Sequence, residues 1–194
     1  MLDHAARYLA HGLIPIPIPE GQKGPQHEGW QTTTAQNALA AFHGPGGNLG
    51  VLLGPSGIVD VDLDVPEALP FARALLPPTA CFGRPGNPES HWWYRCPAGC
   101  YAKHNDVPRA SADPEARHLP SKTLVELRAG NAQTVAPPSV HPSGEAIEWV
   151  RPLADIVTID APDIARRVSH VAAGALMVRH WPAVSRPEAQ PALA

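Results

Sequence analysis

The sequence is poor in cysteine, has no excess of basic residues and contains no long apolar segment. Its 194 residues include three cysteines, Cys81, Cys96 and Cys100. This small, odd number predicts free thiols in a reducing cytoplasm instead of a disulfide framework. The N-terminus lacks the basic start of a signal peptide, and prolines interrupt its apolar stretch, so we expect neither export nor membrane insertion.

The charge balance also excludes some classes of protein. The formal net charge is −3, so the chain is not a strongly basic nucleic-acid binder, and any contact with DNA must come from a local patch. No G-x-x-x-x-G-K-[ST] segment is present, which excludes a P-loop ATPase. An apolar content of 44% argues for a packed core, and 24 prolines predict long ordered connections.

One group of cysteines and histidines resembles a metal site only loosely. Cys96, Cys100 and His104 recur at four-residue intervals, and His118 offers a fourth ligand. This spacing is not a usual zinc pattern, and a proline and a glycine lie within it. We therefore favour ordinary thiols over structural zinc.

The most informative segment is residues 58–64, where apolar residues alternate with Asp60, Asp62 and Asp64. Such alternation is typical of a β-strand that carries all three carboxylates on one face, about 7 Å apart. Mutual repulsion would raise their pKa values unless a cation lies nearby. Mg²⁺ or Mn²⁺ is the natural partner of such oxygens. The alternative is a half-buried strand whose outer face is acidic.

Two further strands carry polar groups that suit the same site. In the strand at residues 124–128, Glu126 and Arg128 share a face; the alternative is a surface ion pair. In the strand at residues 91–95, His91 and Trp93 share a face, and His91 follows Ser90. His91 is suited to bind a phosphate, although an ordinary polar residue at a sheet end fits the pattern as well.

The segment at residues 136–144 contains three prolines and no secondary-structure periodicity. Prolines stiffen it, so it can present Ser139 and His141 in a fixed geometry. A plain hairpin connection is the alternative.

The remaining pattern predicts an α+β fold. Helical spacing predicts helices at residues 2–10, 66–75 and 164–176, and alternating prolines place residues 14–19 on a sheet edge. We predict that the strand at 49–53 forms a hairpin with the acidic strand, and that the strands at 124–128 and 133–136 pair. Thr34 is predicted to cap a short helix, and residues 97–121 to form a loop.

These motifs together resemble the bifunctional primase/polymerase domain of the archaeo-eukaryotic primase superfamily. The resemblance spans roughly residues 5–150 and includes the acidic strand, Ser90 and His91, and the segment from Glu126 to Trp149 with its Pro-Pro-Ser-x-His. It implies a prim-pol fold with an RRM-like catalytic sheet flanked by helices, plus a C-terminal helix. We expect residues 1–155 to form this domain and residues 156–194 a C-terminal helix and linker tail.

The resemblance also implies roles for particular residues. Asp62 and Asp64 correspond to the paired acids of the family, Glu126 to its third carboxylate and Ser90 with His91 to its s-x-H motif. Asp60 is an extra acid, so two adjacent pairs remain possible as metal ligands. These residues would form the catalytic and metal site for two Mg²⁺ or Mn²⁺ ions, with the nucleotide bound by a set comprising Ser90, His91, Arg128, Ser139 and His141.

The implied activity is template-directed nucleotide addition to a 3′-hydroxyl, as by a DNA primase or polymerase. Its partners would be single-stranded or primed DNA, dNTP or NTP, and a separate replicative helicase. Two alternatives remain: a non-catalytic binding remnant of a replication protein, and a metal-dependent phosphodiesterase.

Overall fold

The computed structural model describes residues 1–44, 46–100, 102–106 and 122–181. These residues form three α-helices, ten strands and several short 3₁₀-helices, which confirms the predicted α+β class. The helices are α1 (Leu2–Ala10), α2 (Leu69–Leu75) and α3 (Ala161–His180). The strands are β1 (Ile14–Ile18), β2 (Asn48–Leu52), β3 (Ile58–Leu63), β4 (Cys81–Arg84), β5 (Asn87–Arg95), β6 (Ala102–Asp106), β7 (Lys122–Arg128), β8 (Gln133–Ala136), β9 (Glu148–Arg151) and β10 (Val157–Thr158).

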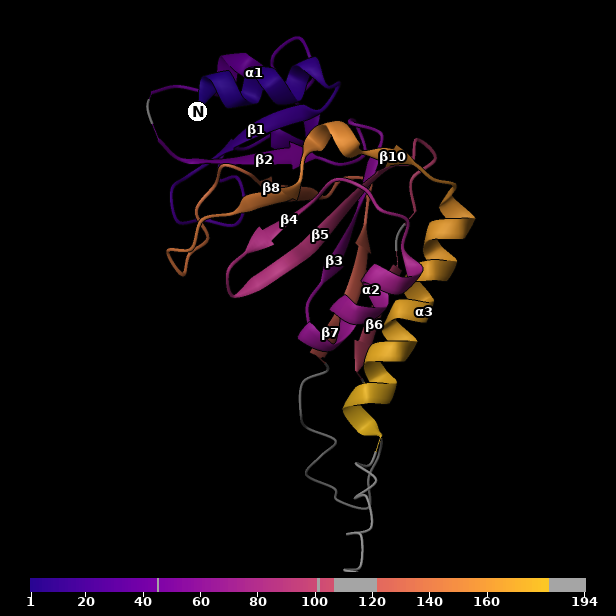
Figure 1. Cartoon of the computed structure of the whole chain (residues 1–194). Coiled ribbons are helices and arrows are strands. Elements are labelled where there is room, and N and C mark those ends of the chain that lie inside the picture. The colour runs from indigo at the N-terminus through magenta and orange to yellow at the C-terminus, as the bar shows by residue number, and fades with distance from the viewer. Residues whose placement is uncertain (45, 101, 107–121, 182–194) are drawn as a thin grey trace, which may run out of the picture.

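The strands form two sheets. The small sheet has the order β1-β2-β8 and is antiparallel. The large sheet has the order β6-β7-β3-β5-β4-β9, also antiparallel, and β10 joins it parallel to β5. In Figure 1, α2 and α3 cover one face of the large sheet, while α1 lies with the small sheet away from these helices.

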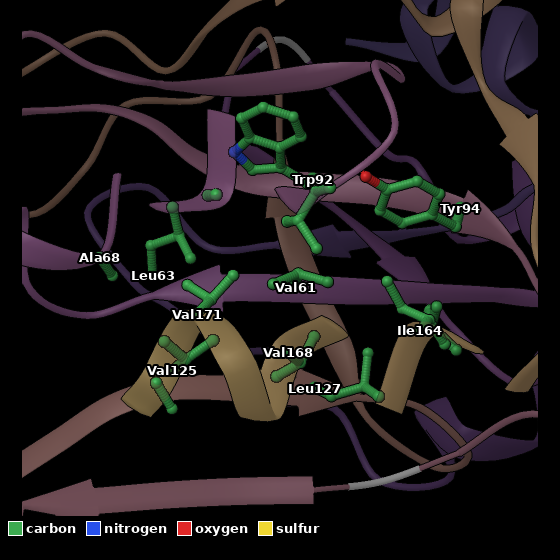
Figure 2. Packing of buried hydrophobic residues seen from close by; sticks show 14 of the residues in the cluster. Val61, Leu63, Ala68, Trp92, Tyr94, Val125, Leu127, Ile164, Val168 and Val171 are labelled. Atoms are coloured by element: carbon green, nitrogen blue, oxygen red, sulfur yellow. The ribbon is translucent and has the colours of Figure 1, made fainter. Parts of the chain in front are cut away.

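The acidic strand β3 lies in the middle of the large sheet and separates two kinds of environment. Val61 and Leu63 point toward the helices, where they pack with Val168 and Val171 of α3 (Figure 2). Ile58 points the other way, into a second apolar cluster that also contains residues of the small sheet. Because side chains alternate along a strand, Asp60 and Asp62 share the face of Ile58 and therefore lie on the side of the small sheet.

The predicted hairpin between residues 49–53 and the acidic strand is wrong. A turn leads from β2 to β3, with the Gly57 amide donating to the Gly54 carbonyl at 2.9 Å, but the two strands enter different sheets. The predicted pairing of residues 124–128 with 133–136 is wrong for the same reason, since β7 pairs with β3 and β8 with β2. In both cases a short turn carries the chain from one sheet to the other instead of closing a hairpin.

Two other local predictions differ from the structure. Residues 102–106, predicted to be loop, form β6 at the edge of the large sheet beside β7; residues 107–121 lie outside the described part of the chain. Thr34 does not cap a helix through its side chain. Its amide instead donates to the Asn37 side chain at 2.8 Å, and a 3₁₀-helix follows at Ala38–Ala41.

The two ends of the described chain agree with the sequence pattern. The Ile-Pro strand β1 lies at the edge of the small sheet. Proline has no amide hydrogen, and at an edge this does not cost the sheet a hydrogen bond between inner strands. The predicted C-terminal helix is α3, whose Ile164 and Val168 are fully buried in the core (Figure 2). The predicted tail lies outside the described residues, and the domain boundary at residue 155 stays a prediction. Within the described residues, no helix is long and apolar enough to cross a membrane.

Candidate functional site

Three adjacent strands bring the predicted site residues together on one face of the large sheet. Asp62 on β3 lies directly opposite His91 on β5 and directly opposite Glu126 on β7. One row further along, Asp60 lies opposite Arg128 in the same way. The residues that alternation placed on one face of each separate strand therefore form a single polar patch.

Asp62, His91 and Arg128 of this patch line a cleft of about 330 Å³ to which both sheets contribute residues, whereas Asp60 and Glu126 do not line it. Among the predicted site residues, Asp62, Asp64, Ser90, His91, Arg128 and His141 line the cleft. The lining also includes the basic residues Lys23 and Arg84. The cleft thus combines acidic and basic groups, as a polyanion that binds together with cations would require.

The carboxylates of this site repel one another. Burial and the charges of Asp62 and Glu126 together raise the pKa of Asp64 to about 6. The pKa of Asp62 is also raised, chiefly by burial and by the Asp60 charge, although His91 and Arg128 oppose this shift. A concentration of negative charge at this point is therefore costly without an added cation.

Asp60 differs from the other two acids because it lies beneath the cleft and is completely buried. Its Oδ2 accepts a hydrogen bond from the Thr134 hydroxyl at 2.6 Å and lies 3.0 Å from Nδ1 of His91. Arg128 Nη1 is 3.7 Å from the same oxygen. Burial alone would raise the pKa of Asp60, but His91, Arg128 and Thr134 together hold it below its usual value.

His91 is held on several sides. Its ring stacks on Phe82, with centroids 4.8 Å apart and planes at 19°, while Nδ1 contacts Asp60. Burial would lower its pKa, but Asp62 and Asp60 raise the pKa to about 9. At neutral pH the ring is therefore a cation at the floor of the cleft, suited to contact an anionic group.

The donor set suits a hard divalent cation. Within the described ranges, no group of three or more His, Cys, Asp or Glu side chains is arranged to hold a metal ion. Mg²⁺, however, is usually bound by one or two carboxylates together with substrate phosphates and water. Asp62 and Asp64 provide such oxygens on the cleft, and Glu126 lies beside Asp62 in the adjacent strand. The chemistry of these residues therefore fits an ion that arrives with a phosphate ligand.

The Pro-Pro-Ser-x-His loop contributes only part of the predicted set. His141 lines the cleft and is held by Ser143, whose hydroxyl lies 2.7 Å from Nδ1. Ser139 is buried instead, and its hydroxyl donates to the Ala136 carbonyl at 2.6 Å and accepts from the Leu49 amide at 2.9 Å. The Ser139 side chain thus supports the loop from below and does not line the cleft.

Some residues of the cleft were not among those predicted. Lys23, Arg84 and Gln133 come from a loop, from β4 and from β8, and each reaches the cleft only through the tertiary fold. Thr134 on β8 also lines the cleft and donates a hydrogen bond to Asp60. Lys23 lies within residues 5–150, over which the resemblance extends, and its positive charge was the available sign of a role in the cleft.

Comparison with known families identifies the family of this chain. The family model described as bifunctional DNA primase/polymerase, N-terminal, matches residues 5–163, which is most of the chain. The chain therefore belongs to this family, and nucleotide and nucleic-acid binding is the property the family implies. A search of curated proteins finds no match.

Proposed function

We propose that this protein is a template-directed nucleotidyltransferase that adds nucleotides to a 3′-hydroxyl, as a DNA primase or polymerase. The observation that carries the proposal is the juxtaposition of Asp62 with both His91 and Glu126 across three strands. Acidic groups that can hold divalent cations thereby lie beside a cationic ring that can hold a phosphate.

The site residues divide into two groups by charge. Asp62, Asp64 and Glu126 would hold one or two Mg²⁺ or Mn²⁺ ions, which when bound lower the pKa of the primer hydroxyl and stabilise charge on the α-phosphate. His91 and Arg128 would contact the incoming triphosphate, with Ser90 beside His91. Lys23, Arg84 and His141, which also line the cleft, would hold the rest of the triphosphate or the template.

Positioning is the main contribution of the chain itself. Phe82 and Asp60 immobilise the His91 ring, and the strand pairing fixes its separation from Asp62. Preorganised groups of this kind lower the barrier because little reorganisation remains when charge develops in the transition state.

The proposal is tested by incorporation of labelled dNTP or NTP on single-stranded and primed DNA, in Mg²⁺ and then in Mn²⁺. We expect template-dependent product from the wild type and none from the Asp62→Ala/Asp64→Ala double variant. The variant should remain folded, because removing clustered like charges relieves repulsion. Asp155→Asn, at an exposed carboxylate away from the cleft, is the control. Product formation by the double variant would refute the assignment.

A non-catalytic binding protein is the second candidate, and one observation favours it. Arg128 Nη1 lies 3.7 Å from carboxylate oxygens of both Asp60 and Asp62, so a side-chain cation already offsets part of their charge. Such a protein would retain template or nucleotide on a filter but give no product. Loss of DNA ends without triphosphate consumption would instead indicate a phosphodiesterase.

We also propose that the protein acts in the cytoplasm with a separate replicative helicase. A primase needs exposed single strands, which a helicase produces from duplex DNA. Stimulation of product formation on duplex DNA by an added helicase would test this.

A further inference from the structure

Asp60 has a place in the site that neither the acidic pattern nor the family match assigns. All three acids of the strand alternate onto one face, yet Asp60 does not line the cleft and none of its surface is exposed. Its two oxygens are already engaged by neighbours. Thr134 donates to Oδ2 at 2.6 Å, and His91 Nδ1 lies 3.0 Å from Oδ2 and 3.3 Å from Oδ1.

Asp62 contrasts with Asp60 in these respects. Its nearest cationic atoms, on His91 and Arg128, are both 3.7 Å away, which is beyond hydrogen-bond distance. Its side chain is 20% exposed, whereas that of Asp60 is 0% exposed. Asp62 therefore retains lone pairs for a ligand in the cleft, while Asp60 is committed to the protein.

We propose that Asp60 is a positioning residue that orients His91, not a metal ligand. Its carboxylate accepts a hydrogen bond from Nδ1 of His91, so Nε2 is the ring nitrogen left for an anionic ligand. The Phe82 ring, stacked 4.8 Å away, restricts tilting of the imidazole, and the Asp60 contact selects between its two flipped orientations.

Thr134 extends this arrangement to the small sheet. It lies on β8 and lines the cleft, whereas Asp60 lies on β3, so their hydrogen bond joins the two sheets at the cleft. Arg128 Nη1 also donates to the Thr134 hydroxyl at 3.2 Å. The carboxylate of Asp60 therefore contacts both His91 and Thr134, so a shift of β8 would also change the orientation of His91.

The inference rests on the proposed function for the identity of the ligand, a nucleoside triphosphate, but the orientation itself is measurable in the free protein. Long-range ¹H–¹⁵N NMR above the His91 pKa of about 9, where the ring carries a single proton, should show that proton on Nδ1 in the wild type. This signal should disappear in Asp60→Ala and persist in Asp60→Asn, whose amide oxygen still accepts a hydrogen bond. An unchanged signal in Asp60→Ala would overturn the proposal.

The kinetic test separates orientation from metal binding. We expect Asp60→Ala to raise the KM for triphosphate about tenfold with a smaller change in kcat, and Asp60→Asn to restore much of the loss. Mn²⁺ affinity, measured by electron paramagnetic resonance, should remain within about twofold of the wild type in Asp60→Asn and fall sharply in Asp62→Asn. Equal loss of Mn²⁺ affinity in both variants would make Asp60 a ligand and refute the proposal.

Removing the buried charge of Asp60 can prevent folding, so a second variant is needed that keeps Asp60. Thr134→Val is that variant, and it should raise the KM for triphosphate by a smaller factor than Asp60→Ala. Circular dichroism monitors its fold. An unchanged KM in a folded Thr134→Val variant would contradict the proposed link to the small sheet. If the wild type neither binds nor incorporates triphosphate, the proposed function fails, while the His91 signal still decides whether Asp60 orients the ring.

Discussion

Asp62 on β3 and Glu126 on β7 lie directly opposite each other in adjacent antiparallel strands. Like charges in this position normally destabilise a sheet, by up to about 1 kcal/mol per pair. A mixed pair would have stabilised the same two strands. The pairing of Asp62 with Glu126 is therefore unfavourable for folding but suited to binding a divalent cation.

Glu126→Gln should lower the pKa of Asp64 below its value of about 6, because the Glu126 charge is one of the causes of the raised value. The free energy of unfolding should rise by about 0.5 kcal/mol as the repulsion with Asp62 is relieved. Carbon-detected NMR titration and urea denaturation measure these two effects. Asp155→Asn should change neither, and an unaltered Asp64 titration in Glu126→Gln would contradict the electrostatic description.

The raised pKa of His91 makes stability depend on pH. Because this pKa is about 9 in the folded protein and 6.5 is its ordinary value, the stabilisation is complete below pH 6.5 and is lost as the pH rises through 9. At most about 3 kcal/mol is involved. Urea denaturation between pH 6 and pH 10 should show this loss in the wild type.

Two histidine variants complete this test. His91→Gln should remove the loss between pH 6.5 and pH 8, below the range where the raised pKa values of Cys81 and Cys100 also lower stability. Its overall stability will be lower since Asp60 then loses a partner. His170→Gln, at an exposed position on α3, should retain the dependence. Parallel curves for the wild type and His91→Gln would show that His91 is not responsible.

Ser139→Ala should affect folding more than substrate binding. The substitution leaves the buried Leu49 amide without its partner at 2.9 Å, which costs about 1–3 kcal/mol. We expect a lower Tm and, at temperatures where the variant is folded, a KM for triphosphate within about twofold of the wild type. Ser169→Ala, exposed on α3, is the control. A severalfold increase in KM with an unchanged Tm would show that Ser139 binds the nucleotide.

Gly83→Ala should disturb the segment that presents His91. A Cβ at Gly83 on β4 would lie 2.4 Å from the Asn87 carbonyl oxygen and 2.7 Å from the Glu89 amide nitrogen, so the start of β5 must move. We expect a lower Tm and weaker triphosphate binding, measured by calorimetry. Gly24→Ala, where the nearest atom would be 3.7 Å from the Cβ, should leave the Tm nearly unchanged. Equal Tm values for the two variants would contradict the close packing at Gly83.

Local sequence pattern predicted the candidate site better than it predicted the sheets. Alternation predicted the face that Asp62, His91 and Glu126 each occupy on their own strand. In the folded sheet the three faces adjoin, because Asp62 pairs with both His91 and Glu126. Family resemblance supplied the expectation that the three strands adjoin. Helical periodicity likewise predicted α3, because its apolar spacing corresponds directly to its buried side.

Strand pairing could not be predicted in the same way, because it is not a local property. A short turn such as Gly54–Gly57 is compatible both with a hairpin and with a connection between two sheets. Here it connects two sheets. The burial of Asp60, which distinguishes it from Asp62, could not be predicted from the sequence either, because it also depends on contacts with distant segments. Its buried carboxylate accepts a hydrogen bond from Thr134 on β8, which is 74 positions away along the chain.

The most direct test of the central claim is a crystal structure with Mn²⁺ and a non-hydrolysable nucleoside triphosphate. We predict anomalous manganese peaks beside Asp62 and Asp64, with Glu126 adjacent and the triphosphate extending toward His91. An ordered triphosphate with no manganese in this cleft, or manganese bound only elsewhere in the protein, would contradict the claim that carboxylates from β3 and β7 together hold the catalytic cations.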